Sequence, residues 1–184
     1  MSTPFDDPDF EGDEAYFDRG NENRVFDSRL LRRPVGVLLF HKPILHTPHD
    51  SVTDAMRSMQ AEHRGAVLIT EDGTRGTRLQ GIVTERDVLI RIVDRGRNPA
   101  ILPLAEVMTP DPDRLRIDDS VARVLNKMSV GGFRHVPVVD EADRPVFLIS
   151  VKDVVQFLVN AFPREILNLP AEDAPTHPRA REGA

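Results

Sequence analysis

Apolar residues recur along the chain with two different periods, and together these predict helices and strands. Within 52–59 the apolar positions follow the spacing i, i+3, i+4 and i+7, which indicates an amphipathic helix. The run 66–69 is short, continuous and apolar, which predicts a strand buried on both faces. A second strand is expected at 79–83 after a polar turn. A second helix is expected to begin at Thr84 and to end near Gly96.

The same series of elements occurs twice in the chain. DSVTDAMRSM at 50–59 aligns with DSVARVLNKM at 119–128 at a shift of 69 residues. GIVTERDVLIRIV at 81–93 aligns with FLISVKDVVQFLV at 147–159 at a shift of 66. The Asp-Ser pair before each first helix is expected to supply its N-cap.

The repeated unit is therefore a short strand, helix, strand, strand and helix. A unit of about 60 residues buries too little surface to be stable by itself. We therefore expect a mixed α/β (α+β) fold, in which two β-α-β-β-α repeats pack sheet to sheet as one pseudo-twofold module.

Composition narrows the class of protein further. The 184 residues are 40% apolar and 29% charged, and no run approaches the roughly 20 apolar residues of a membrane span, so a soluble protein is expected. The net charge of -6 argues against nucleic-acid binding, and the lack of cysteine excludes thiolate ligands and a cysteine nucleophile. The six histidines form no zinc motif, so no metal is expected. The N-terminus shows no secretory signal, which favours a cytoplasmic location.

The two ends of the chain differ from the repeats. Residues 1–18 hold seven acidic side chains and no Lys or Arg, and a group of arginines follows. The last residues are proline-rich and otherwise small or polar. We expect a largely flexible arm at 1–33, one repeat at 34–98, the other at 99–162 and a tail at 163–184. An arm that binds a partner is the alternative interpretation.

The tandem unit resembles a pair of cystathionine β-synthase (CBS) domains, the Bateman module found as a regulatory or free-standing element in many proteins. The matching motifs include GAVLIT and GIVTERD in the first copy, and FRHVPVVD and FLISVKD in the second. The resemblance covers roughly residues 36–162. It implies a non-catalytic module that senses AMP, ADP or ATP, or in some cases S-adenosylmethionine, and that often assembles as a disc-like dimer.

In that family a Ser or Thr followed three residues later by Asp, at the start of the second helix, is the recurrent ligand motif. Here it matches Thr84 and Asp87, and also Ser150 and Asp153. A helix N-terminus offers free amides to phosphate, and a carboxylate accepts the hydroxyls of a ribose diol. The same residues also suit a capping box, which needs no ligand. Both interpretations stay open, and they compete for the carboxylate oxygens.

Other residues near the motif are candidates for contacts with the rest of a nucleotide. Arg86 and Lys152 occupy equivalent places in the two copies, and Arg134 stands where many nucleotide-binding CBS repeats carry a basic residue. The counterpart of Arg134 is Gly65, so the second copy is expected to supply more ligand contacts than the first. A flat base would lie against strand residues of both copies, namely Ala66, Val67, His135, Val136 and Pro137.

Two functions compete on this sequence. The first is a sensor that binds an adenine nucleotide or a related adenosyl ligand between the repeats and signals to an unidentified protein partner. The second is a ligand-free dimerisation scaffold. An enzyme is not expected, because no arrangement of nucleophile and base is recognisable. A homodimer is expected, because the second helices carry more apolar residues than one buried stripe needs, and its expected interface includes Val88, Ile92, Val155 and Val159.

Overall fold

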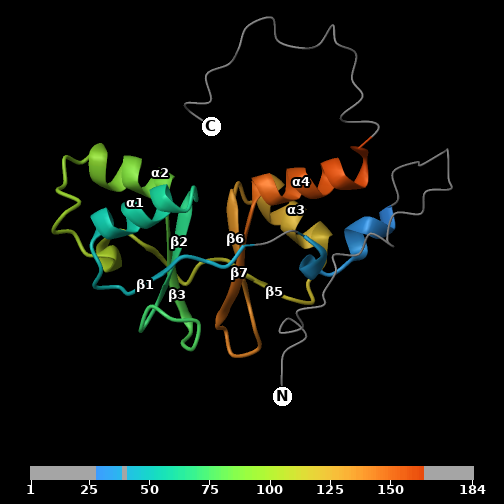
Figure 1. The fold of residues 1–184 in the computed structure, drawn as a ribbon, viewed down its shortest axis with the longest axis horizontal. Helices are drawn as coiled ribbons and strands as arrows, with labels where there is room; N and C mark the ends of the chain where they lie inside the picture. Colours follow the sequence, from blue (N-terminus) through green and yellow to red (C-terminus); the bar gives the residue numbers. More distant parts are fainter. Residues whose placement is uncertain (1–27, 39–40, 164–184) are drawn as a thin grey trace, which may run out of the picture.

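The computed structural model of the protein describes residues 28–38 and 41–163. Most of the arm and the tail that the sequence predicts to be flexible lies outside the described residues. The described part consists of two units of the same build (Figure 1). Their sheets face each other in the middle of the molecule, and the helices lie on the outer sides.

The first repeat contains a four-stranded sheet in the order β1-β2-β3-β4. Strand β2 pairs in parallel with β1 and antiparallel with β3. Strand β4 is an added edge strand that pairs with β3 and belongs to residues 94–114, the connection between the last helical turn of the first repeat and the first strand of the second. The elements are β1 (Leu45–His46), α1 (Val52–Ala61), β2 (Ala66–Thr70), β3 (Leu79–Thr84), α2 (Glu85–Val88) and β4 (Thr109–Pro110).

The second repeat has the sheet order β5-β6-β7, again with one parallel and one antiparallel pairing. This matching order confirms the predicted twofold repeat and the mixed α+β fold. Every residue of β2 is buried, and in β6 only His135 is partly exposed, as expected for strands covered on both faces. The elements are β5 (Leu115–Arg116), α3 (Val121–Ser129), β6 (His135–Val139), β7 (Pro145–Ser150) and α4 (Val151–Ala161).

The described residues form three apolar clusters, one in each repeat and one between them. One lies under α1 and α2, and a second lies under α3 and α4, where Phe147 is its largest fully buried side chain. The third lies between the sheets, where Ala66 and Leu68 of β2 share a cluster with Val139 of β6. This third cluster confirms sheet-to-sheet packing. It buries the inner faces that neither small repeat could cover alone.

The second helix of the first repeat differs from its prediction. The apolar pattern predicts one helix from Thr84 to about Gly96, but α2 ends at Val88 and the chain continues as a π-helical turn, η4 (Leu89–Val93). An apolar run this short fits the spacing of an α-helix and that of a π-helix, so the periodicity of the sequence does not distinguish the two. Gly96 has a φ of 60°, which ends the turn as expected of a C-terminal glycine. In the second repeat α4 is continuous.

The predicted N-caps of the first helices are found in one repeat only. Ser51 Oγ accepts the amide of Asp54 at 3.1 Å. Ser120 is the N-cap residue of α3, but its side chain makes no capping hydrogen bond. The Val121 amide, one of the free donors at the start of α3, instead donates to the carbonyl of Arg33 at 2.8 Å. The incoming backbone therefore partly replaces a side-chain cap.

The segment before β1 packs on the second repeat. Val35 and Leu38 are almost fully buried in the core of the second repeat, although the expected boundaries assigned residues 34–38 to the first. His41 then pairs with Leu148 of β7 before the chain enters β1. Each repeat is thus entered by a segment that pairs with the sheet of the other. Short turns complete these connections: η2 (Ser28–Arg32), η3 (Val35–Val37) and η5 (Leu104–Glu106).

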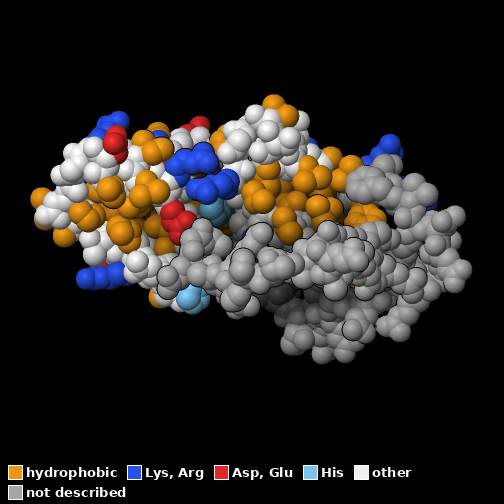
Figure 2. All heavy atoms as spheres, turned by 90° about the horizontal axis from the view of Figure 1, so that it is seen from above, with side chains coloured by type: hydrophobic (Ala, Val, Ile, Leu, Met, Phe, Trp, Pro, Cys, Tyr) orange, Lys and Arg blue, Asp and Glu red, His pale blue; other side chains and the backbone are white. Residues whose placement is uncertain are grey.

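The outer surface of the helices is apolar, but the expected interface residues are only partly there. Val88 and Ile92 are buried, because they face the core of the first repeat, so their assignment to a dimer interface is wrong. Val155 is 52% exposed, and Val159 is partly buried. Figure 2 shows two apolar areas on this face. The other exposed apolar residues on these helices are Leu89, Ile90 and Val93 of η4 and Val151 of α4.

Candidate ligand-binding cleft between the repeats

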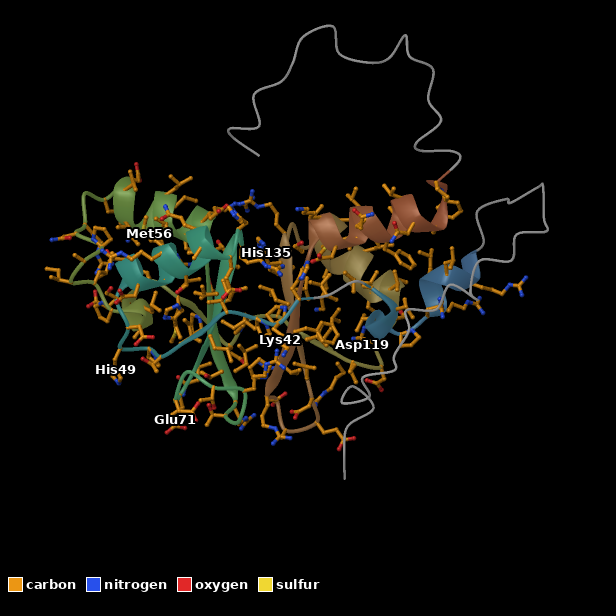
Figure 3. All side chains as sticks on the ribbon, in the orientation of Figure 1. Lys42, His49, Met56, Glu71, Asp119 and His135 are labelled. Atoms are coloured by element: carbon orange, nitrogen blue, oxygen red, sulfur yellow. The ribbon has the colours of Figure 1, made fainter. Side chains whose placement is uncertain are left out.

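A cavity of about 200 Å³ lies where the two repeats meet. Figure 3 shows one of its wall residues, His135, between the two sheets at the end of the molecule that carries the helices. The walls come from both repeats and from their connection. They comprise Ile82, Thr84, Arg86 and Asp87 of the first repeat, Thr109, Pro112 and Asp113 of the connection, and Gly132, Phe133, Arg134, His135 and Pro137 of the second repeat.

Thr84 and Asp87 form a capping box at the start of α2. Asp87 Oδ2 accepts the Thr84 amide at 2.9 Å and the Thr84 hydroxyl at 2.7 Å, and the Asp87 amide donates to Thr84 Oγ1 at 3.4 Å. Asp87 Oδ1 lies 3.2 Å from Nε of Arg91, one helical turn later. Both oxygens of this carboxylate therefore have a partner within the protein.

Ser150 and Asp153 form the same box at the start of α4. Asp153 Oδ2 accepts the Ser150 amide and the Ser150 hydroxyl, each at 2.7 Å. Asp153 Oδ1 lies 3.7 Å from Nε2 of His41, which is beyond hydrogen-bond distance. The Asp153 side chain is only 6% exposed. Both motifs thus act as caps, and a ligand could use only the Oδ1 atoms without breaking them.

Arg91 connects the first motif to the segment between the repeats. Its guanidinium donates to the carbonyls of Val107 at 2.6 Å and Met108 at 2.9 Å, and to Thr109 Oγ1 at 3.1 Å. Because Thr109 also lines the cavity, Arg91 sets the distance between two of its walls.

Arg134 and His135 form the wall contributed by the second repeat. Burial lowers the pKa of His135 from its ordinary value of 6.5, the guanidinium of Arg134 lowers it further, and Asp153 acts in the opposite direction. The ring is therefore neutral at pH 7. A Cβ added at Gly65 would lie 3.2 Å from His135 Cε1. The His135 imidazole, which belongs to the second repeat, therefore lies close to the backbone of the first.

The cavity groups the predicted residues differently from the sequence analysis. Arg134, expected beside Ser150 and Asp153, lines the same cavity as Thr84 and Asp87. Ser150, Asp153 and Lys152 are not among the lining residues. The reason is the packing of the repeats against each other, which places the first turn of α2 beside the residues that precede β6.

The proposed apolar wall is only partly present. Pro137 and His135 line the cavity, but Val67 and Val136 point into the cores of their own repeats. Ala66 is buried between the sheets. Their side chains serve packing in this structure, because β2 and β6 are covered on both faces.

Sequence reasoning missed the residues that join the two halves of the cleft. Thr109, Pro112 and Asp113 come from the connection, and Phe133 precedes Arg134 by one residue. Their roles depend on how the repeats pack, which no local pattern carries. The stretch VMTPDPD at 107–113, which contains Thr109, Pro112 and Asp113, also matches the family, as a motif of the second copy.

Charged side chains of both signs surround the cleft: Arg86 and Arg134 line it, and so do Asp87 and Asp113. Figure 2 shows Lys and Arg side chains, and Asp or Glu side chains next to them, beside a His in the middle of this face, between the two apolar areas. Among residues 28–38 and 41–163, no group of three His, Asp or Glu side chains could hold a metal ion. Within the same ranges, no helix is long and apolar enough to cross a bilayer.

Comparison with known proteins agrees with the twofold architecture. The sequence model of the CBS domain matches the chain twice, at residues 43–94 and 104–160. The chain belongs to the CBS domain family. The CBS domain-containing protein CBSCBSPB2 of Arabidopsis thaliana is 33% identical over 132 residues, which are 72% of this chain and 23% of that protein. The mitochondrial protein CBSX3 of the same plant is 30% identical over 127 residues, 68% of this chain and 61% of that protein. The chain therefore spans less than two thirds of these relatives.

Solved structures of CBS pairs share the fold. A protein with CBS domains from Burkholderia ambifaria, described as a putative signal-transduction protein, is 27% identical with a TM-score of 0.57, covering 73% of this chain and 93% of that one. A conserved protein from Pyrococcus horikoshii has a TM-score of 0.63 at 22% identity, covering 70% and 93%. The CBS pair of MJ0100, solved with methylthioadenosine and S-adenosyl-L-methionine, has a TM-score of 0.60 at 24% identity, covering 70% and 97%.

Proposed function

We propose that this CBS pair is a sensor that binds an adenine nucleotide, AMP, ADP or ATP, in the cleft between its repeats. The observation that carries the proposal is the position of Arg134, whose side chain lines one cavity with Arg86 and with the start of α2. Arg86 and the start of α2 belong to the first repeat and Arg134 belongs to the second, so a phosphate bound here could contact both repeats at once.

The remaining parts of the nucleotide can be assigned by chemistry. The 200 Å³ cavity is smaller than a typical site for a whole nucleotide, so it takes the ribose and phosphate, and the base lies across its mouth. Phe133, which is 40% exposed beside the cavity, offers a ring for the base to stack on. Asp87 binds the ribose diol through Oδ1, where the diol takes the place of Arg91.

The solved complexes of the MJ0100 pair support an adenosyl ligand. That protein shares the fold and binds methylthioadenosine and S-adenosyl-L-methionine. Neither molecule carries a phosphate. S-adenosylmethionine is therefore the second ligand we propose, and the guanidinium groups of Arg86 and Arg134 favour the nucleotides over it.

Calorimetric titration of the full chain with AMP, ADP, ATP, S-adenosylmethionine and methylthioadenosine tests the proposal. We expect at least one nucleotide to bind more tightly than methylthioadenosine. Arg134→Gln should weaken its binding by about tenfold or more, because a charge-assisted hydrogen bond is lost. Arg57→Gln is the matched control, since Arg57 is an exposed arginine of α1 away from the cavity. Equal binding by the Arg134 variant and the original chain would contradict the proposal.

A ligand-free scaffold is the second candidate function. It is favoured by the two capping boxes, in which Thr84, Asp87, Ser150 and Asp153 have partners without any ligand. If none of the five compounds binds at millimolar concentration, the scaffold becomes the better explanation.

We further propose that the module acts by binding alone, without catalysis, and passes the ligand state to a protein partner. Its location in the cytoplasm remains a prediction. One relative, CBSX3, is named as a mitochondrial protein.

A further inference from the structure

A second and larger cavity lies at the opposite end of the sheets from the cleft. Its volume is about 810 Å³, and three separate segments line it: the β2–β3 hairpin, the residues after β4, and the β6–β7 hairpin. Figure 3 shows Glu71, one of its wall residues, at the hairpin end of the first sheet, while His135 lies at the helix end. The two cavities have no lining residue in common.

Arginines from all three segments meet at this hairpin-end cavity. Arg78, Arg114 and Arg144 line it, one from each segment. Arg78 lies 2.7 Å from Oδ2 of Asp143, and Nε of Arg114 lies 3.4 Å from Oδ1 of the same carboxylate. Arg116 is also 3.4 Å from Asp143 Oδ1. Three guanidinium groups thus share one carboxylate.

Asp143 is fixed in this position by the fold. Its φ is 59°, a left-handed conformation that Asp tolerates, and its carbonyl accepts the amide of Leu79 at 2.9 Å. Hydrogen bonding to Arg78 lowers the pKa of Asp143, although burial opposes this, and the charges of Arg114 and Arg116 lower it further. One negative charge is therefore held permanently against three positive charges.

The other acidic partners at the cavity differ in how firmly they are held. Asp140 is fixed, because Oδ2 accepts Nε of Arg144 at 2.7 Å and Oδ1 accepts the amides of Ala142 and Arg144, each at 2.9 Å. Asp111 pairs with Arg114 at 2.6 Å, but its side chain is 84% exposed, and Glu71 is exposed as well. Exposed ion pairs contribute little to stability, so an incoming anion can replace Asp111 at low cost. Arg78 uses only one terminal nitrogen for Asp143, which leaves its other donors available at the cavity.

We propose that the hairpin-end cavity binds a small molecule that carries phosphate groups. Guanidinium groups bind phosphate through paired hydrogen bonds, and here three of them converge from separate segments. Each already has a carboxylate partner, Arg144 having Asp140, so the phosphate has to replace the exposed Asp111 and use the donors that Arg78 leaves available. Pro110 and Leu79 supply apolar surface for the body of the ligand, and a volume of 810 Å³ is typical of sites for molecules of nucleotide size. Because the site joins both hairpins and the connection, its ligand would bridge the two repeats.

Calorimetric titration of the full chain with inorganic pyrophosphate tests this site. Arg114→Gln should lower the affinity about tenfold, since one charge-assisted contact is lost. Arg78→Gln should also weaken binding, and because Arg78 is largely exposed, this variant separates a lost contact from a folding defect. Asp143→Asn should strengthen binding, because it removes the competing carboxylate. Thermal melting of each variant establishes that it is folded.

A control variant makes the outcome specific. Arg57→Gln removes an exposed arginine that lines neither cavity, and it should bind pyrophosphate as the original chain does. Arg134→Gln tests the cleft instead: binding that is lost in this variant but kept in the Arg114 and Arg78 variants would place pyrophosphate in the cleft and overturn the proposal, and so would no binding at all. Nucleotide binding at the cleft should be unaffected by Arg78→Gln, so the two proposals fail or succeed separately.

Discussion

Replacing Asp153 by alanine separates the capping role of the motif from a ligand role. The variant loses the two hydrogen bonds that Oδ2 accepts from the Ser150 amide and hydroxyl, each at 2.7 Å. These bonds are charge-assisted and the side chain is buried, so we take the upper part of the range for an N-cap, about 2 kcal/mol. For a chain of this size this corresponds to a fall in Tm of roughly 4–8 °C.

The matched variant is Asp87→Ala, which loses an equivalent box and also the contact between Oδ1 and Arg91. Its Tm should fall at least as far. The two variants should differ in their response to a nucleotide. At about 100 times its dissociation constant, a ligand adds about 2.7 kcal/mol of stability, so the Tm should rise by roughly 5–10 °C. Because the cavity surrounds Asp87, we expect the Asp153 variant to keep this rise and the Asp87 variant to lose most of it.

Circular dichroism melts with and without ligand measure both effects. An unchanged Tm in the ligand-free Asp153 variant would refute the capping energy derived from the structure. Loss of the ligand-induced rise in the Asp153 variant, with the rise kept in the Asp87 variant, would refute the assignment of the cavity and restore the ranking expected from sequence.

Three further predictions concern pH, the connection and assembly. The pKa of His135 is lowered by folding, so the unfolded chain takes up the proton more readily and the free energy of unfolding should decrease as the pH falls below 6.5. In urea titrations between pH 7.5 and 5, the free energy of unfolding of His135→Gln should depend less on pH than that of the original chain. Arg91→Ala should lower the free energy of unfolding in the same assay by about 3 kcal/mol, because it removes hydrogen bonds to two carbonyls and a contact with Asp87. A decrease below about 1 kcal/mol would mean that the connection is held by other contacts. The exposed apolar side chains of η4 and α4 should pair two copies, so light scattering should give twice 20.7 kDa and Val155→Glu should give the monomer mass. A monomeric parent chain would contradict this.

The sequence was sufficient to predict the repeat and most of its elements. Spacing of apolar residues predicted α1 and α3, and the continuous runs predicted β2 and β6 as strands covered on both faces. These predictions succeeded because each depends on a local period that burial imposes on one helix or strand. The end of α2 at Val88 was not predictable in this way. Four of the next five residues are apolar, Arg91 being the exception, so their pattern fits an α-helix and a π-helix equally well.

The contents of the cleft were harder to predict because they depend on packing between repeats. Alignment of the copies placed Arg134 opposite Gly65 and assigned it to the motif of its own repeat. In the structure its side chain lines the cavity of the other repeat's motif, with Thr84 and Asp87. An internal repeat predicts which residues are equivalent. It does not predict which of them meet, because that depends on the contact between the sheets.

The two capping motifs differ in the residue that stands one helical turn after the Asp, and this difference makes the two pseudo-symmetric repeats chemically unequal. One turn after Asp87 stands Arg91, whereas the equivalent position after Asp153, at the shift of 66 residues, is Phe157. Arg91 bonds the carboxylate and the connection together, while Phe157 packs against the apolar core of the second repeat. A diol that replaces Arg91 at Asp87 Oδ1 must compete with a cation that also holds the connection. At Asp153 the nearest cationic candidate is His41, at 3.7 Å, on the segment that enters the first repeat. Asp87 therefore faces Arg91, which is bonded to the connection, and Asp153 faces His41, which lies on the segment that enters the first repeat.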